Sequence, residues 1–199
     1  MGRPFRIAQA FCIVAPALLA TSVVGARAGD WDALHVSAES PPGWAPGTEQ
    51  IKRARETFEQ FNAALDGGDY AHVYAMTLNP ELYPAESKFI LEERQNSESL
   101  GGLIQRQIVN VTWTKDPKDA VSLGIYVAVD IAARYTNADR FCGYLILFQS
   151  DEQADFKVMR RHSVVMLNAD AARISKEESD RLWAVNSRLC PNYNPDVDL

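Results

Sequence analysis

The chain has 199 residues, enough for one ordinary domain and a short extension. Apolar residues make up 47% and charged residues 23%, close to the averages of soluble globular proteins, which excludes a wholly disordered chain and a multi-span membrane protein. The net charge of −6 leaves no basic surplus to neutralise phosphates, so we expect no nucleic-acid partner.

The N-terminus has the pattern of a secretory signal peptide. Arg3 and Arg6 precede an uncharged, largely apolar stretch over residues 7–24, and the small residues Ala26 and Ala28 follow it. This order predicts export to the periplasm or out of the cell, with cleavage after Ala28 and no membrane span afterwards. An uncleaved membrane anchor is the alternative, because a run of about 18 apolar residues is just long enough to cross a bilayer.

Export would decide the state of the cysteines. Cys12 lies within the predicted signal peptide, which leaves Cys142 and Cys190 in the mature chain. Two cysteines in an exported protein allow a single pairing, so we predict one disulfide between them. Neither cysteine has a histidine or a third cysteine at the spacing of a zinc site, and we expect no metal and no cofactor.

The first half of the mature chain is expected to be a tail followed by helices. Residues 29–47 are rich in proline, glycine and small polar residues, which is typical of a flexible tail. Apolar residues then recur at spacings of three and four, which predicts a long helix that Thr48 caps and a glycine pair ends. Two more helices are expected over residues 69–78 and 84–100. The apolar stripe of the last is thin, so it should lie at the surface.

After the next glycine pair the apolar period changes to two, which predicts strands. The expected strands cover residues 109–114, 121–134, 141–149 and 156–167. The second has the clearest alternation, with apolar residues at every odd position from 121 to 133. Such a strand buries one face and leaves the other polar.

The C-terminal segment, residues 168–199, is expected to hold a further helix. Ser175 lies three residues before Glu178, which is the spacing of a capping box at a helix start. Cys190 would attach the end of this helix to the third strand. The residues expected to pack on the body are Leu182, Val185 and Leu189.

Three helices followed by four antiparallel strands predict an α+β domain over residues 48–167. Short motifs within it carry a resemblance to known proteins, at Leu65, Gly68, Asp69, Tyr70, Leu100, Gly101, Arg106, Gly124, Tyr126 and Val129. Over residues 56–159 the chain resembles a family of exported bacterial domains of unknown function with the nuclear transport factor 2-like, or cystatin-like, cone fold. The resemblance implies helices packed on a curved four-stranded sheet. That fold hosts both enzymes and binding modules, so no activity follows from it.

Candidate site residues lie on the polar face of the second strand, since the chain has none of the common catalytic motifs. Tyr126, Asp130 and Arg134 are spaced by four and point the same way, and His162 on the last strand joins them in one register. If this face lines the inside of the cone, Asp130 would act as a base and Tyr126 or His162 as a hydrogen-bond donor. A solvent-facing sheet side, with Asp130 paired to an arginine, predicts the same pattern.

These observations leave three functions open. We expect a non-catalytic domain that binds a small apolar ligand or a protein partner in the mouth of the cone, as a monomer or a homodimer. The alternatives are a cofactor-independent isomerase or cyclase that uses Asp130 and Tyr126, and an accessory envelope protein that acts through its acidic surface. An enzyme needs a buried carboxylate facing a cavity, whereas a binding module needs only the cavity.

Overall fold

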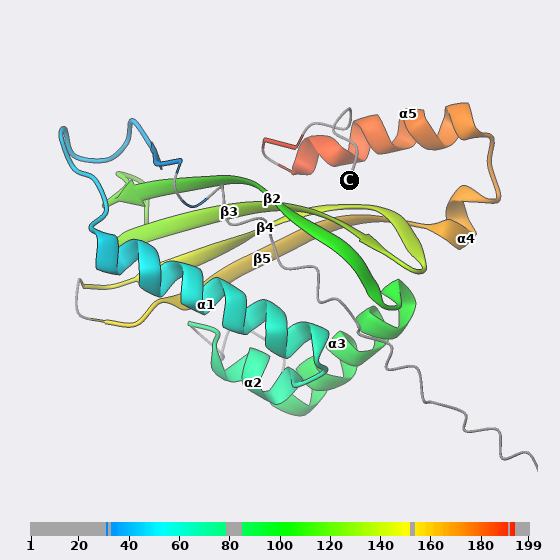
Figure 1. Cartoon of the computed structure of the whole chain (residues 1–199), viewed down its shortest axis with the longest axis horizontal. Coiled ribbons are helices and arrows are strands. Elements are labelled where there is room, and N and C mark those ends of the chain that lie inside the picture. Colours follow the sequence, from blue (N-terminus) through cyan, green and yellow to red (C-terminus); the bar gives the residue numbers. More distant parts are fainter. Residues whose placement is uncertain (1–30, 32, 79–84, 152–153, 191, 194–199) are drawn as a thin grey trace, which may run out of the picture.

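The structure is a computed structural model, and it describes residues 31, 33–78, 85–151, 154–190 and 192–193. The predicted signal peptide lies outside the described residues. The fold is α+β: one mixed sheet has helices on both of its faces (Figure 1). None of the helices within the described ranges is both long and apolar enough to cross a membrane.

Three helices cover one face of the sheet (Figure 1). They are α1 (Thr48–Asp66), α2 (Tyr70–Ala75) and α3 (Glu86–Leu100). The N-cap of α1 is Gly47 and not Thr48, and the Gly47 N–H donates to the Gln50 side chain at 2.8 Å. Asp69 caps α2, because its carboxylate accepts a hydrogen bond from the His72 N–H at 3.2 Å. These three helices lie close to the ranges expected from the apolar spacing.

The sheet has five strands in the order β1-β2-β3-β4-β5. They are β1 (His35–Val36), β2 (Leu103–Lys115), β3 (Ile125–Tyr135), β4 (Ala138–Gln149) and β5 (Lys157–Leu167). Strands β2 to β5 form the expected antiparallel meander, and β1 pairs in parallel with β2. The sheet is therefore mixed and five-stranded, which corrects the expected four-stranded antiparallel sheet.

The extra strand comes from residues 29–47, the segment expected to be a flexible tail. Trp31 in this segment is only 2% exposed, and its ring centroid lies 5.8 Å from that of Phe58. The Ser37 N–H donates to the carbonyl of Trp113 at 2.8 Å, which continues the pairing beyond β1. The described part of the segment is thus attached to the edge of β2 by backbone hydrogen bonds and by a buried ring.

Strand β3 begins later than the alternation predicted. Val121 and Leu123 are 97% and 73% exposed and lie in the preceding loop. Gly124 ends this loop with φ 151°, and its N–H donates to the Asp116 carboxylate at 2.7 Å. A Cβ there would lie 2.4 Å from the carbonyl oxygen of Gln149, so the close approach requires glycine. The apolar face is confirmed from the following residue onward.

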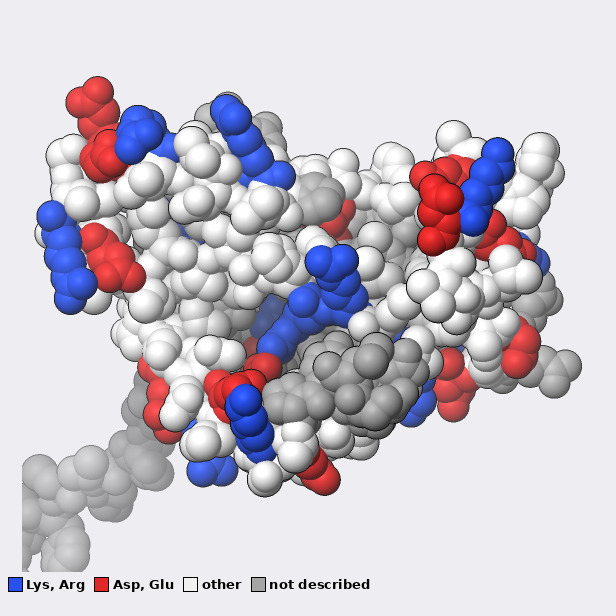
Figure 2. Space-filling view, turned by 180° about the vertical axis from the view of Figure 1, so that it is seen from behind, with Lys and Arg blue, Asp and Glu red and all other residues white. Residues whose placement is uncertain are grey.

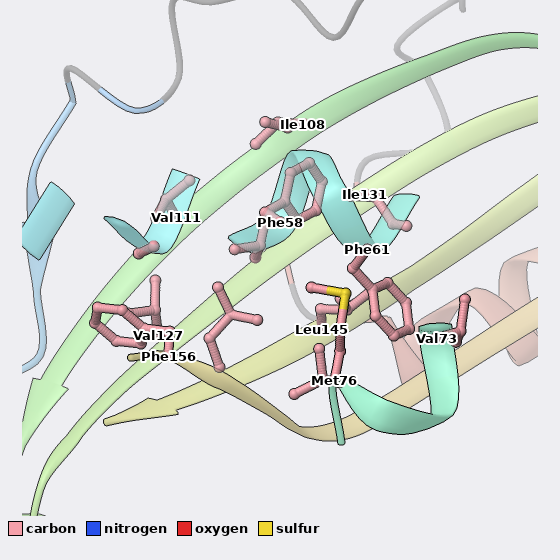
Figure 3. Packing of buried hydrophobic residues seen from close by; sticks show 14 of the residues in the cluster. Phe58, Phe61, Val73, Met76, Ile108, Val111, Val127, Ile131, Leu145 and Phe156 are labelled. Carbon is pink, nitrogen blue, oxygen red and sulfur yellow. The ribbon is translucent and has the colours of Figure 1, made fainter. Parts of the chain in front are cut away.

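The main core lies between the three helices and the sheet, as Figure 3 shows. Phe58 and Phe61 of α1 are 1% and 2% exposed and face the strands. Every odd position of β3 from 125 to 135 is buried on this side. Burying each large apolar side chain stabilises the fold by roughly 1.5–3 kcal/mol. The helix stripe and the strand alternation therefore meet in one core.

Helices α4 (Asn168–Ala171) and α5 (Lys176–Asn186) and the 3-10 helix η3 (Ser187–Leu189) follow β5. Helix α5 lies over the opposite face of the sheet (Figure 1). The Ser175 hydroxyl accepts a hydrogen bond from the Glu178 N–H at 3.2 Å, so this predicted cap is confirmed. The counts of helices and strands thus exceed the expected ones, because α4 and β1 gave no clear pattern.

The C-terminal helix is held by Trp183 and the predicted disulfide. Cys142 and Cys190 are bonded, with their Cα atoms 6.0 Å apart, and both pack with Trp183 in a second small core. Val185 and Leu189 were expected to face the body, but they are 50% and 61% exposed. The large Trp183 side chain faces the sheet instead. This orientation of α5 leaves Val185 and Leu189 on the side toward solvent.

Candidate functional site

A cavity of about 710 Å³ lies between the sheet and helices α1 and α3, near one end of the sheet. Its walls are the C-terminal parts of α1 and α3, the start of β2 and β4, and the end of β3 and β5. This volume is within the usual range for small-molecule sites, about 300–1,000 Å³. We refer to it below as the cavity.

Apolar side chains from four strands, from α1 and from the end of α3 form one part of the cavity wall. They are Leu65, Leu100, Leu103, Ile131, Phe141, Leu145, Val165 and Leu167. Most belong to the alternating inner positions of the sheet, which continue the main core toward this end. A ligand with an apolar body would release water from these surfaces, and that release favours binding by about 25 cal/mol per Å².

The cavity exists because α3 does not fill it. Only Phe89 and Glu93 of α3 are buried, and its last two turns carry small polar residues, including Asn96, Ser97 and Ser99. Leu100 is the one large apolar residue of these turns, and it packs against the main core. The other side chains of these turns are polar, so space remains between the two layers. The thin apolar stripe, which predicts a surface helix, therefore also predicts loose packing beneath it.

Arg106 is a buried cation in the wall of the cavity. It lies on β2, is 8% exposed, and its two terminal nitrogens donate to the Asp66 carboxylate at 2.7 and 2.8 Å. Burial disfavours the charged guanidinium, but the hydrogen bonds and charge of Asp66 outweigh it, and the pKa of Arg106 is raised above its ordinary value. This two-point ion pair joins the end of α1 to the sheet.

Tyr135 lies beside this ion pair at the end of β3. It is 8% exposed, and its ring centroid is 5.4 Å from that of Phe141. Its hydroxyl oxygen accepts a long hydrogen bond, 3.5 Å, from Arg106. A polar oxygen is therefore held at a fixed place in an otherwise apolar part of the wall.

A second ion pair crosses the cavity from α3 to β5. Arg161 donates to the carboxylate of Glu93, which is 7% exposed. The Arg161 guanidinium also lies over the ring of Phe61, 6.0 Å from its centroid. This pair is one of the polar contacts that fix α3 to the sheet, together with the hydrogen bond from the Asn137 N–H to the Leu100 carbonyl.

The two ion pairs leave the inner part of the cavity without net charge. The buried Arg106 and the half-buried Arg161 are each matched by one carboxylate. Glu98 and Asp170 line the outer part, and Asp170 bonds to Arg173 at 3.4 Å. Figure 2 shows the molecule from behind, with a hollow near the centre of the view and charged side chains beside it among mostly uncharged atoms.

The predicted site residues lie mainly on the opposite face of the sheet. Tyr126, Asp130 and Arg134 alternate with the buried inner positions of β3 and do not line the cavity. The Tyr126 hydroxyl donates to the Ser122 carbonyl at 2.6 Å. His162 borders the cavity, but its ring lies against Tyr144 on the far side, with the ring centroids 5.6 Å apart.

Asp130 is buried under the C-terminal segment. It is 3% exposed, and its carboxylate accepts a hydrogen bond from Asn192 at 2.7 Å. Burial raises the pKa of Asp130, and hydrogen bonds from Asn192 and Asn110 oppose this rise. Among the described residues its hydrogen-bond partners are amides rather than the expected arginine. The register brings Asp130, Tyr144 and His162 side by side across three strands, away from the cavity.

The sequence does not place Arg106 at the cavity because of a β-bulge in β2. The register of β2 shifts between Ile108 and Asn110, so Arg106 and Ile108 share the inner face with Val111. Strict alternation from Val111 places Arg106 on the polar face. The sequence offers one sign of this placement, which is that Arg106 lies two positions before Ile108. That spacing does not show where a bulge occurs.

The described residues contain no group of three histidine, cysteine, aspartate or glutamate side chains placed to hold a metal ion. Comparison with known proteins found no matching family model and no matching curated protein.

Proposed function

We propose that this chain is an exported, non-catalytic binding protein that takes up a small, mainly apolar ligand in the cavity. The proposed fold type is the nuclear transport factor 2-like cone. Its support is the arrangement of three N-terminal helices on one face of an antiparallel meander. Export is supported by the N-terminal sequence pattern and by the pairing of Cys142 with Cys190.

The single observation that carries the proposal is the composition of the cavity. About 710 Å³ of space is bounded by apolar side chains, mainly from the sheet, and by polar groups that include α3 side chains, Tyr135 and two internal ion pairs. Small-molecule sites have this combination, in which the apolar surface provides affinity and the polar groups provide orientation. The internal ion pairs are already satisfied, so they impose no requirement for a charged ligand.

The enzymatic alternative has less support. It assigns Asp130 as base and Tyr126 as donor, and neither residue lines the cavity. Asp130 is also covered by Asn192, so a substrate would first have to displace the C-terminal segment. A general base must reach the proton that it removes, within about 3 Å or through one water.

Native mass spectrometry of the protein purified from its export compartment tests the proposal. The blocking variant is Val165→Trp, because Val165 lines the cavity and is 37% exposed, which places it near the opening. The matched control is Val121→Trp, in a loop away from the cavity. The proposal predicts a bound small molecule on the native protein and on Val121→Trp, and none on Val165→Trp.

Two results would contradict the proposal. One is equal retention of the molecule by Val165→Trp, which would locate it elsewhere. The other is a native protein that carries nothing and binds no member of a panel of apolar alcohols, ketones and hydrocarbons up to their solubility limits.

A further inference from the structure

We infer that the ligand of the cavity is an uncharged molecule with a carbonyl or hydroxyl oxygen, and that this oxygen accepts a hydrogen bond from the hydroxyl of Tyr135. The inference rests on the proposed function and names the chemical class of its ligand. It follows from the hydrogen bonds that Tyr135 and the two arginines already make.

The hydroxyl of Tyr135 has a proton to donate. Its oxygen accepts from Arg106, so the hydrogen points away from the guanidinium, which has no acceptor. Among the described residues, no side chain or carbonyl accepts this hydrogen. Tyr135 is 8% exposed and lines the cavity, so an acceptor must come from the cavity itself.

The orientation of the Tyr135 hydroxyl is fixed before any ligand arrives. Its ring packs against Phe141, and its oxygen is held by Arg106, which is itself held at two points by Asp66. A donor that is already ordered loses little entropy when it binds an acceptor. Tyr135 is therefore suited to select a ligand by the position of one oxygen atom.

An anionic ligand is disfavoured by the pairing of the arginines. The terminal nitrogens of Arg106 are used by Asp66, and its Nε is buried without a partner among the described residues. Arg161 is bonded to Glu93. A carboxylate in the cavity would approach the carboxylates of Asp66 and Glu93, while both terminal nitrogens of Arg106 are already occupied, and like charges repel strongly where water is excluded.

The apolar wall specifies the rest of the ligand. Ile131 lies on the same strand as Tyr135, Leu145 lies on the neighbouring strand β4, and Val165 lies toward the opening. A ligand with its oxygen at Tyr135 would lay its hydrocarbon body along these side chains. The chemical class is thus an apolar ketone or alcohol and not a fatty acid.

Three probes of matched shape test this inference. The first is prodan, an uncharged naphthyl ketone with environment-sensitive fluorescence. The second is its analogue with a methylene group in place of the carbonyl, and the third is the corresponding naphthyl carboxylate. Binding of each is measured by fluorescence titration to the native protein, to Tyr135→Phe and to Tyr144→Phe. Tyr144 lies on the opposite face of the sheet and provides the control.

The inference predicts that Tyr135→Phe weakens binding of the ketone by about three- to tenfold, the effect of one hydrogen bond. Binding of the methylene analogue should stay within about twofold, because the phenyl ring of the variant preserves the wall. The emission of the bound ketone should shift to shorter wavelength in Tyr135→Phe, since the hydrogen bond to its carbonyl is lost. Tyr144→Phe should match the native protein, and the carboxylate should bind at least about tenfold more weakly than the ketone.

The outcomes separate the inference from the proposed function. Suppose that the ketone and its methylene analogue both bind the native protein. If Tyr135→Phe then weakens the two equally, or weakens neither, the inference is wrong and the binding function stands. Tightest binding by the carboxylate would also overturn the inference alone. If none of the probes binds the native protein, both are contradicted. Thermal unfolding of Tyr135→Phe establishes that a lost signal is not a loss of fold.

Discussion

Both terminal nitrogens of the Arg106 guanidinium donate to the Asp66 carboxylate, at 2.7 and 2.8 Å, and so join strand β2 to the last residue of helix α1. This contact closes one side of the cavity and fixes the arginine that orients Tyr135. It also neutralises the most buried cation of the site. The ion pair is therefore important both for stability and for the preference for an uncharged ligand.

Asp66→Asn is expected to destabilise the fold by about 3 kcal/mol, because it leaves the buried Arg106 charge without a counter-charge. The value is at the lower end of the range for buried pairs, since the Asp66 side chain is 32% exposed. Urea unfolding measures the change. Glu59→Gln, which breaks an exposed pair with Arg55, is the control and should cost about 0.5 kcal/mol or less. Equal small effects in both variants would show that the Asp66 pair is not a structural contact.

Removing the disulfide is expected to lower the free energy of unfolding by about 2–4 kcal/mol, because the bond closes a long loop between residues 48 positions apart. Thermal unfolding with and without dithiothreitol measures the effect on the native protein. A variant with both Cys142→Ala and Cys190→Ala is the control, since a reductant should not change its melting temperature. If the reductant leaves the native melting temperature unchanged, the bond is absent or contributes nothing.

The stability contributed by Asp130 should depend on pH in the direction set by its burial. Burial raises its pKa in the folded protein above the ordinary value of 3.8, so folding favours the protonated form. This contribution is fully present below pH 3.8 and is lost as the pH rises through the folded-state pKa. As the pH rises above 3.8, the native protein should therefore lose stability relative to Asp130→Asn.

Asn192→Ala provides the companion measurement for Asp130. It removes a hydrogen bond that stabilises the carboxylate, so it should raise the pKa of Asp130 further and enlarge the loss of stability toward neutral pH. Urea unfolding of the three proteins at several pH values tests both statements. A native protein that gains stability over Asp130→Asn with rising pH would contradict the burial of this carboxylate.

The packing of α1 is tested by Phe58→Ala, which should cost about 3–5 kcal/mol because the ring is 1% exposed in the main core. Val185→Ala is the control on α5. Its side chain is 50% exposed, so the change should stay within about 0.5 kcal/mol. Similar small effects of the two substitutions would mean that the ring of Phe58 does not face the sheet.

The sequence predicts the helices and strands of this fold well because most of them bury one continuous stripe. The spacing in α1 and the alternation in β3 each depend on one partner surface, so local pattern and final burial agree. The disulfide also follows from the sequence, because two cysteines allow one pairing. The edge strand β1 does not, since two residues carry no period and its pairing depends on contacts of neighbours such as Trp31.

The site is less predictable, because it depends on which face of the sheet lies under α1 and α3 and on where the strand register shifts. Alternation identifies two faces of β3 but not the face under the helices, and the polar face with Asp130 is the one opposite the cavity. The bulge in β2 then reverses the expected face of Arg106. The cavity exists because the last turns of α3 carry few large apolar side chains. The absence of apolar residues in a sequence does not indicate where a cavity will form.

We propose above all that the cavity, and not the opposite face of the sheet, binds the ligand. Methyl NMR during titration with prodan tests it most directly, because neighbouring residues on one strand report on opposite faces. We predict chemical-shift changes for the methyl groups of Leu145 and Val165, which line the cavity, and little change for Ile146 and Val164, which point to the other side. Changes confined to Ile146 and Val164, or no changes at all, would contradict the account.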